Sequence, residues 1–452
     1  MSKSNDGDCL PRQQAASQSI DQGDMMSSTE NQAMERQLIR NAKQNAYVIG
    51  VGMTRFGKHL GRSLNSLARE AIKQALDDAG IEASQLNAAW MGTGAAPVIT
   101  GQVCIAGEAV LRGMGVGRIP VINVENACAT SSTAFQQACT MVTHGLYDIV
   151  LAAGFEKLYH DDKSRTFSVF DGCVDIEEQD SVLAFLKDGI NRSDAQVDLA
   201  LVGKDRSLFM DIYATWARDY LAMAGGDPRH LAMVTAKNSR HGSLNPRAQF
   251  QDVLTVEQIL AARKIADPLT LPMCSPIGDG AAAAVIVSET ALRRLSARAP
   301  IRVAASLLVS GYDAAPGEAP EVARWAADLT YQAAGMGPRD LSVVELHDAS
   351  AASELMYYES LGLCGRGEGI ALLESGATEL GGRIPVSVSG GLNRKGHPIG
   401  ATGLGQIFEL VEQLRGNCGA RQVQDAGVGL AENGGGFIGA DAAVMSMTIL
   451  TR

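Results

Sequence analysis

The stretch PVINVENACATSSTAFQQA, residues 120–138, joins an apolar run, a small polar loop and a helical run. Its first residues include valine and isoleucine, which are typical of a buried strand. The small residues after Cys128 indicate a helix, and Gly145 supplies its stop signal. A strand that passes through a short loop into a helix is the repeating unit of an α/β fold, so this stretch predicts that fold class.

Apolar runs and helical runs alternate on both sides of this stretch, from residue 46 to the end of the chain. The clearest helix, 63–80, starts with Ser63 as its N-cap and stops at Gly80. The other expected helices are 130–145, 319–335, 350–362 and 400–416. The expected strands are 46–53, 88–94, 120–126, 148–156, 279–289, 298–311, 341–348, 385–391, 426–436 and 441–450.

The alternation starts again after residue 300, and the two parts of the chain share an order. Each part contains a strand that starts with Pro-Val, at Pro120 and at Pro385, followed by a polar loop and a small-residue helix. The loop carries Cys128 in the first part and His397 in the second. Two related halves imply a pseudo-twofold axis, which predicts that these two loops meet at the ends of their strands.

The composition is that of a globular protein, with 452 residues, 46% of them hydrophobic and 20% charged. The net charge of −11 argues against a nucleic-acid partner or an anionic membrane surface. No apolar run approaches the length of a membrane span. The eight cysteines form no CxxC pair, which predicts a reduced, cytoplasmic compartment and offers no metal-ligand motif.

Shifts in composition set the expected domain boundaries. Residues 1–45 are rich in Gln, Ser, Asn, Asp and Met, which predicts a disordered or loosely helical N-terminal extension. We expect one half at 46–300 and a second half at 301–452. Within the first half, about 156–270 carries more charged and aromatic residues than the core, which predicts a separate helical excursion.

Cys128 has two interpretations. A thiol at the start of a helix faces unpaired N–H groups and the positive end of the helix dipole, which would lower its pKa and make it reactive. Free cysteine is also among the most buried residue types, so Cys128 can equally be a core residue, as Cys139 in the middle of the same helix is expected to be.

His347 and His397 each stand in a loop after an expected strand, where α/β proteins bind ligands. A lone histidine is more often structural. A cysteine and two histidines on such loops, however, form a nucleophile, its base and an oxyanion donor. The three glycines 434–436 either allow the close approach of an N–H oxyanion donor or form a bulge or tight turn.

Four motifs together resemble the thiolase superfamily: NACATSSTA at 126–134, ELHDAS at 345–350, GGLNRKGHPIGATGLGQ at 390–406 and GGG at 434–436. The nearest subtype is the sterol-carrier-protein or lipid-transfer-protein type thiolase. The resemblance runs from about residue 46 to the C-terminus. It implies a duplicated thiolase fold, in which two βαβαβαββ halves form a five-layer αβαβα core with an inserted loop domain.

The resemblance also implies a role for each motif residue. Cys128 would be the nucleophile that accepts the acyl group, and His397 would take its proton. His347 would help to bind the thioester oxygen, while the N–H groups of Cys128 and Gly434 would form a second oxyanion hole. The implied substrates are acyl-CoA and coenzyme A, with no permanently bound cofactor and no metal, and the implied assembly is a homodimer.

One feature departs from the family pattern. Thiolases usually carry a second cysteine that acts as acid and base, either in the C-terminal Gly-rich motif or, in the sterol-carrier subtype, after the His-Asp pair. Here those places hold Glu432 or Asn433, and Ala349. Glu432 can substitute as the base. Alternatively, His347 both binds the thioester oxygen and transfers the proton, or the enzyme performs only part of the thiolase cycle.

We therefore expect a thiolase-type acyl-CoA acyltransferase that acts through a Cys128 acyl-enzyme, in thiolytic cleavage or Claisen-type condensation of a 3-oxoacyl-CoA. One alternative is a CoA-dependent retro-aldolase that works with a small OB-fold/zinc-ribbon partner subunit and does not need Cys128. Another is a non-catalytic acyl-binding subunit that keeps the fold. The intact set of Cys128, His347 and His397 argues against this last alternative, because binding alone does not need it.

Overall fold

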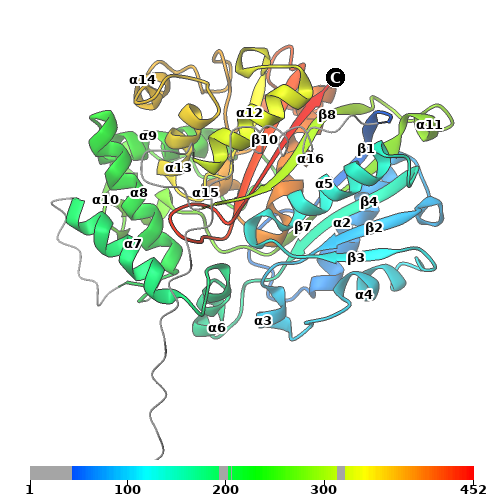
Figure 1. Ribbon diagram of the computed structural model, residues 1–452, viewed down its shortest axis with the longest axis horizontal. Helices are drawn as coiled ribbons and strands as arrows, with labels where there is room; N and C mark the ends of the chain where they lie inside the picture. The colour runs from blue at the N-terminus through cyan, green and yellow to red at the C-terminus, as the bar shows by residue number, and fades with distance from the viewer. Residues whose placement is uncertain (1–42, 193–201, 205, 313–320) are drawn as a thin grey trace, which may run out of the picture. The chain divides into compact units, whose positions relative to one another are not determined.

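A computed structural model describes residues 43–192, 202–204, 206–312 and 321–452 (Figure 1). The expectation for the N-terminal extension lies outside these ranges, apart from residues 43–45. Within the described ranges, no helix has both the length and the apolar composition needed to cross a bilayer.

The first half follows the expected order of strands and helices. Helix α2 (Leu64–Ala79) is capped by Ser63, which accepts the Ser66 N–H at 3.2 Å, and it ends at Gly80 with a left-handed φ of 66°. The other elements are β1 (Ala46–Met53), β2 (Ala88–Gly92), α3 (Ala96–Thr100), α4 (Ala106–Arg112), β3 (Val121–Val124), α5 (Thr130–Thr143), β4 (Ile149–Glu156), β7 (Gly280–Ser288) and α11 (Glu289–Leu292).

The second half repeats this order with one difference. Its elements are β8 (Ile301–Ser310), α12 (Val322–Ala334), β9 (Val343–Glu345), α13 (Ala351–Ser360), α14 (Gly369–Glu374), α15 (Gly391–Lys395), α16 (Thr402–Arg415), β10 (Val428–Gly435) and β11 (Val444–Thr451). The expected strand at 385–391 is wrong, because only an isolated parallel bridge joins Val386 to Val344. Ser387 and Gly390 have φ angles of 54° and 107°, which end the extended run after Val386.

The two halves meet edge to edge in one nine-stranded sheet of order β3-β2-β4-β7-β1-β8-β11-β10-β9. Strands β1 and β8 pair antiparallel at the centre, and the order of strands on one side of this pair mirrors the order on the other. The pairs β2–β3, β2–β4 and β9–β10 are parallel, whereas the pairs nearer the centre are antiparallel. This mirrored order is the pseudo-twofold arrangement that the sequence predicts.

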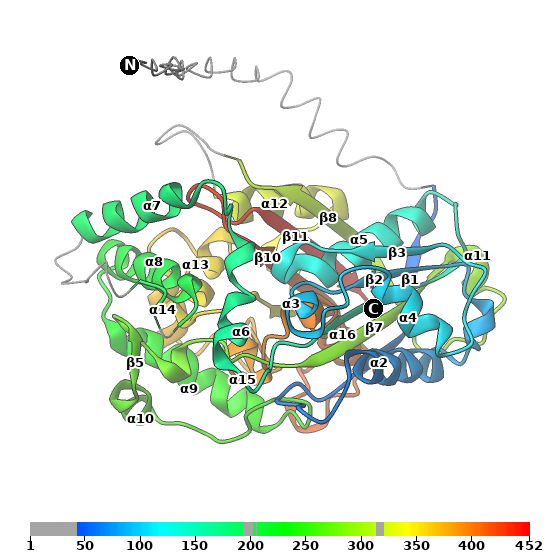
Figure 2. The ribbon, with the colours of Figure 1, turned by 90° about the horizontal axis from the view of Figure 1, so that it is seen from below.

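Two helices lie between the halves and form the middle layer. Helix α5 contacts β4 of its own half and β8 and β11 of the other, and α16 contacts β10 of its own half and β1 and β7 of the other. Helices α2 and α12 cover the outer faces, so Figure 2 shows five layers between α12 and α2. Both α5 and α16 begin directly after a candidate catalytic loop, so this layer brings the two loops together.

The segment between β4 and β7 is mostly helical, as the sequence predicts. It contains α6 (Lys163–Ser168), α7 (Gln179–Arg192), α8 (Leu208–Ala224), α9 (Pro228–Ser243) and α10 (Val256–Ala261), with the short strands β5 (Lys264–Ala266) and β6 (Leu269–Thr270). In Figures 1 and 2 the helices α7 to α10 lie together, away from β2 and β3. Helices α8 and α9 pack on α13 of the second half.

Strand β1 and helix α2 touch backbone to backbone, because β1 has glycine where it meets the helix. A Cβ atom on Gly52 would overlap the carbonyl oxygen of Ala71 and would lie 2.6 Å from the backbone nitrogen of Ala75. No side chain separates the two elements at this point, so the outer layer lies directly on the central strand of the first half.

Gly52→Ala is expected to lower the free energy of unfolding by about 3 kcal/mol, the upper range for an overpacked core, because neither backbone can move aside. Gly61→Ala is the matched control, since a Cβ there meets nothing within 4 Å, and we expect a change below about 0.5 kcal/mol. Denaturant unfolding of both variants measures the difference. Equal stability of the two variants would contradict the close contact between β1 and α2.

Candidate active site

Cys128 lies in a tight 3-10 turn, Ala127–Ala129, between β3 and α5. The turn is held by Thr130, whose hydroxyl donates to the Ala127 carbonyl at 2.7 Å and accepts the Asn126 N–H at 2.9 Å. Ala127 has a left-handed φ of 46°, which is uncommon for a residue with a Cβ. The small residues of this loop therefore serve a sharp turn that places the thiol just before the helix.

His397 meets Cys128 from the other half of the molecule. Its Nε2 lies 3.3 Å from the Cys128 Sγ, and its Nδ1 lies 2.7 Å from the hydroxyl of Thr402. That hydroxyl donates its single proton to the Pro398 carbonyl at 3.1 Å, so it accepts from Nδ1. The tautomer follows from this chain: Nδ1 carries the proton, and Nε2 presents a lone pair to the thiol.

His347 completes the cluster from the loop after β9. Its ring centroid lies 5.1 Å from that of His397, and one ligand-type atom from each of Cys128, His347 and His397 lies within 4.8 Å of the others. The Nε2 atom of His347 is buried and has no hydrogen-bond partner among the described residues. The structure therefore brings together the three residues that the sequence singles out, with one ring nitrogen left for a ligand.

The electrostatics of the cluster correct one expectation. Burial raises the pKa of the Cys128 thiol well above its usual range and outweighs the backbone hydrogen bond that lowers it. The predicted low pKa of Cys128 is therefore wrong for the resting site. Burial also lowers the pKa of His397 well below its usual range, and that of His347 to about 4. At neutral pH the resting site holds an uncharged thiol beside two uncharged imidazoles.

Glu432 and Asn433 are neighbours on β10, but their side chains contact different loops of the site. The Asn433 side chain donates to the Cys128 carbonyl and to the Ser132 hydroxyl, both at 2.9 Å, so it anchors the nucleophile turn. Glu432 is fully buried, and its Oε2 accepts the backbone N–H of His347 at 2.9 Å. Its Oε1 has no partner among the described residues, and burial raises the pKa of Glu432 to about 8.

The glycines after Glu432 allow β10 to approach the nucleophile turn. A Cβ on Gly435 would lie 2.5 Å from the Asn126 carbonyl oxygen and 2.8 Å from the Ala129 nitrogen. The N–H of Gly434 instead stabilises the Glu432 carboxylate, which partly offsets the effect of burial on its pKa. Gly435 is thus one position at which the backbones of the two halves touch.

Sequence reasoning missed Glu156, at the end of β4. Its fully buried carboxylate accepts backbone N–H groups from residues 94–96 and from Gly400 in the His397 loop, at 2.6 Å for Ala96 and 2.9 Å for Gly400. Burial raises the pKa of Glu156 to about 7, against the opposing effect of these donors. No sequence signal separates this glutamate from others, because its partners are backbone groups of distant loops.

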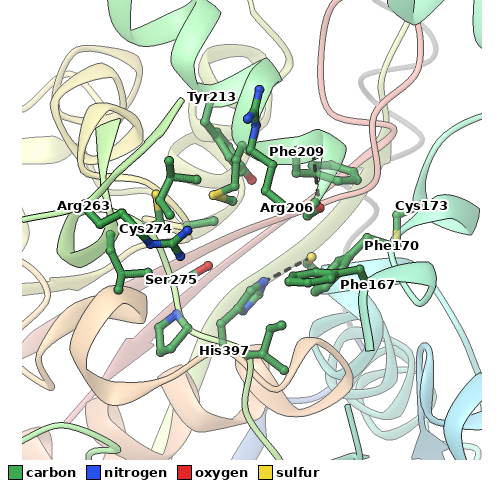
Figure 3. A pocket seen from close by; sticks show the side chains of 18 residues that line it. Phe167, Phe170, Cys173, Arg206, Phe209, Tyr213, Arg263, Cys274, Ser275 and His397 are labelled. Carbon is green, nitrogen blue, oxygen red and sulfur yellow. Dashed lines mark hydrogen bonds between the residues drawn. The ribbon is translucent and has the colours of Figure 1, made fainter. Parts of the chain in front are cut away.

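An open, largely apolar cavity of about 210 Å³ lies beside Cys128. Figure 3 shows His397 between a group of phenylalanine rings and the side chain of Arg263. The lining also includes Ala349, at the place of the second family cysteine. Sequence reasoning missed most of this lining, because it comes from the inserted helices, whose aromatic residues gave no fixed spacing.

The chemistry of this arrangement is that of a nucleophile with its base. A neutral imidazole lone pair 3.3 Å from a thiol can take its proton as the sulfur attacks a carbonyl. A thiol and two imidazoles are also zinc-ligand types, and one such atom from each residue lies within 4.8 Å of the others.

Comparisons with known proteins agree with these motifs. Residues 46–290 match the family model for the N-terminal domain of thiolase, and 314–448 match the model described as thiolase C-terminal domain-like. The chain is 35% identical over 388 residues to benzoylsuccinyl-CoA thiolase subunit BbsB of Thauera aromatica, which covers 84% of this chain and 92% of that protein. It is 36% identical over 399 residues to an acetyl-CoA acetyltransferase of Methanothermobacter thermautotrophicus, covering 87% and 97%.

Human sterol carrier protein 2 is 34% identical over 405 residues, covering 86% of this chain and 70% of that protein. Among solved structures, the Ltp2-ChsH2(DUF35) aldolase has a TM-score of 0.71 at 24% identity, covering 92% of this chain and 98% of that chain. At this identity the structural likeness speaks for the fold alone.

The resting state of Cys128 is open to a direct test with iodoacetamide. Because the pKa of the thiol is raised, its alkylation rate should rise by about tenfold per pH unit from about pH 6 to 8.5 without levelling off. Mass spectrometry of the modified peptides measures this rate, and the exposed Cys104 provides an internal reference for the reagent. A plateau for Cys128 below about pH 7 would instead show a thiolate already formed at rest.

Proposed function

This chain belongs to the thiolase family, and on that premise we propose that it transfers acyl groups of acyl-CoA thioesters through a covalent intermediate on Cys128. The observation that carries the proposal is the 3.3 Å contact between the Cys128 Sγ and the His397 Nε2 inside an apolar cavity. Two of the similar proteins are named for such chemistry, one as a benzoylsuccinyl-CoA thiolase subunit and the other as an acetyl-CoA acetyltransferase.

In the first half-reaction Cys128 gives its proton to His397 Nε2 as its sulfur attacks the C3 carbonyl of a 3-oxoacyl-CoA. The bond between C2 and C3 breaks, the acyl group stays on the sulfur, and C2 takes up a proton as acetyl-CoA leaves. In the second half-reaction the thiol of coenzyme A attacks the acyl-enzyme, and the Cys128 sulfur is released. Each half needs a base on one side and a proton donor on the other.

The oxyanions of these steps have nearby candidate donors. His347 is held neutral by burial, and its unpartnered Nε2 is suited to donate a hydrogen bond to a thioester oxygen. The backbone N–H of Cys128 and an N–H of the 434–436 glycine run are placed by the close approach of Gly435 to the nucleophile turn. Donors fixed in this way need no rearrangement as charge develops on the oxygen.

Coenzyme A itself needs a cationic contact for its phosphates. Arg263 lines the cavity, is exposed, and forms no ion pair within the described residues. Arg206, the other arginine of the lining, is already paired with Asp211. We assign the phosphate contact to Arg263, and no permanently bound cofactor is part of the proposal.

Glu432 is our candidate for the proton transfer that the second family cysteine performs. Its Oε1 is buried and unpartnered beside the His347 backbone, and its pKa of about 8 allows it to gain or lose a proton near neutral pH. Ala349, which lines the cavity at the other family position, has no group that can do this.

A second candidate function follows from the presence of Ala349 in place of the second family cysteine. Without the second thiol, a retro-aldolase that needs only oxyanion donors and a base is chemically sufficient, and such an enzyme does not need Cys128. A small OB-fold/zinc-ribbon partner subunit belongs to this alternative, and the relative from Thauera aromatica is itself described as a subunit.

We also propose that the chain forms a homodimer along β3. This strand is the last in the sheet order, and Ile122 on it is 37% exposed. Ile105 is 62% exposed and directly precedes α4, which packs on β3. A second copy of the chain is the occupant that pairs with such an edge and covers these apolar side chains in one step.

Cys128→Ala is expected to abolish acyl transfer, by several orders of magnitude, because nucleophile and base act as a unit. Intact mass after incubation with acyl-CoA should show an adduct on the parent protein and none on this variant. Cys274→Ala is the matched control, since Cys274 lines the same cavity and should leave the adduct unchanged. Near-normal turnover by Cys128→Ala would reject covalent catalysis and favour the retro-aldolase.

Glu432→Gln tests the proton-transfer assignment. It should slow both half-reactions, by roughly 100-fold for the loss of a general acid–base, because the first half needs a proton at C2 and the second needs a base for the thiol of coenzyme A. In the parent protein this second rate should rise with pH and level off above about pH 8, as the Glu432 carboxyl ionises, and the variant should lose that rise. Unchanged rates in both halves would leave His347 or a partner subunit as the source of the proton transfer.

A further inference from the structure

Phenylalanine and tyrosine rings from two separate elements line the cavity beside Cys128. Phe167 and Phe170 come from α6 and the residues after it, and Phe209 and Tyr213 come from α8. Figure 3 shows Phe167 and Phe170 on one side of His397 and Arg263 on the other. The space next to the nucleophile is thus bounded by aromatic faces and edges.

The aromatic wall reaches the cluster that contains Cys128. Phe170 packs against this small apolar cluster, which also contains Val169 and Ile399. An acyl group bonded to the Cys128 sulfur therefore starts at a cluster against which Phe170 packs.

The wall from α8 is held by further ring contacts. Phe209 and Tyr213 have centroids 6.3 Å apart, Tyr213 and Trp216 are 5.6 Å apart, and Trp216 and Phe437 are 5.8 Å apart. Phe437 is fully buried. A wall supported in this way keeps its shape when empty, so a flat rigid group that matches it loses little entropy on binding.

No unpaired charge lies at the aromatic end of the described lining, where Figure 3 shows Arg206 beside Phe209. The charged side chains of the lining are Arg206 and Arg263; Arg206 is neutralised by Asp211, and Arg263 lies across the cavity from the phenylalanines. A carboxylate or ammonium group carried by the acyl chain would find no partner beside Phe167 and Phe170. The acyl group that fits is uncharged.

We propose that the acyl group accepted by Cys128 carries an uncharged aromatic ring, which the phenylalanine wall binds by edge-to-face and stacking contacts. The proposal rests on the proposed function, since it names the acyl class of that same site. Aromatic pairs prefer these offset geometries and gain more than area burial alone provides, which an alkyl chain of equal length does not.

The test is the rate of Cys128 acylation by three thioesters, measured by intact mass: acetyl-CoA, octanoyl-CoA and 3-phenylpropanoyl-CoA. We expect the phenylpropanoyl adduct to form at least about tenfold faster than the other two, a discrimination that an apolar pocket can provide. An octanoyl or acetyl rate equal to or above the phenylpropanoyl rate overturns the proposal.

Phe170→Ala should lower the ratio of the phenylpropanoyl rate to the acetyl rate by roughly tenfold. Phe250→Ala is the matched control, because Phe250 is 39% exposed, does not line the cavity and should leave the preference intact. Phe209→Ala, from the opposite wall, repeats the test if Phe170→Ala does not fold. A preference that survives both Phe170→Ala and Phe209→Ala overturns the role of the wall.

The same experiment separates this proposal from the proposed function. If none of the three thioesters acylates Cys128 while iodoacetamide still alkylates it, the covalent function itself fails. If acetyl-CoA acylates Cys128 and the aromatic preference is missing, the covalent function stands and only the assignment of the acyl class is wrong.

Discussion

The buried carboxylate of Glu156 connects the two halves at the site. It accepts N–H groups from the loop after β2 and from the loop that carries His397, and both loops would otherwise leave buried donors without partners. This bridge ties the His397 loop to the first half of the molecule through Gly400. The middle layer of α5 and α16 supplies the scaffold, Glu156 fixes the loop that precedes α16, and Thr130 and Asn433 hold the nucleophile turn that precedes α5.

Two opposing influences act on Cys128, and their balance decides its resting state. The start of α5 and the local N–H groups favour a thiolate, but the thiol is almost fully buried and burial favours the neutral form. The Cys128 thiol therefore stays protonated in the resting site. In the proposed reaction it loses its proton only as its sulfur attacks a bound carbonyl, whose oxygen takes up the negative charge. His397 is prepared for that moment by Thr402, which fixes the tautomer that presents a lone pair to the thiol.

Local pattern predicts much of this molecule. The caps Ser63 and Gly80, the alternation of elements and the three motif residues all follow from side-chain type and spacing, and the structure brings those motif residues together. The pattern fails at 385–391, where left-handed residues break an apolar run, and at the pKa of Cys128, which depends on burial by distant segments. Local sequence pattern also cannot predict the aromatic wall or the role of Glu156. Their partners lie in other parts of the chain, and only tertiary packing brings them together.

The separation of the site residues along the chain has a consequence for biosynthesis. Cys128 and His397 are 269 residues apart, and Asn433, which anchors the nucleophile turn, follows later still. At about 5–20 residues per second, a ribosome takes roughly 15 to 55 s to add that length, and throughout this time the nascent chain carries the thiol without its base. A chain that ends before His397 and Asn433 therefore lacks the contact between Cys128 and His397 and the anchor of the Cys128 turn.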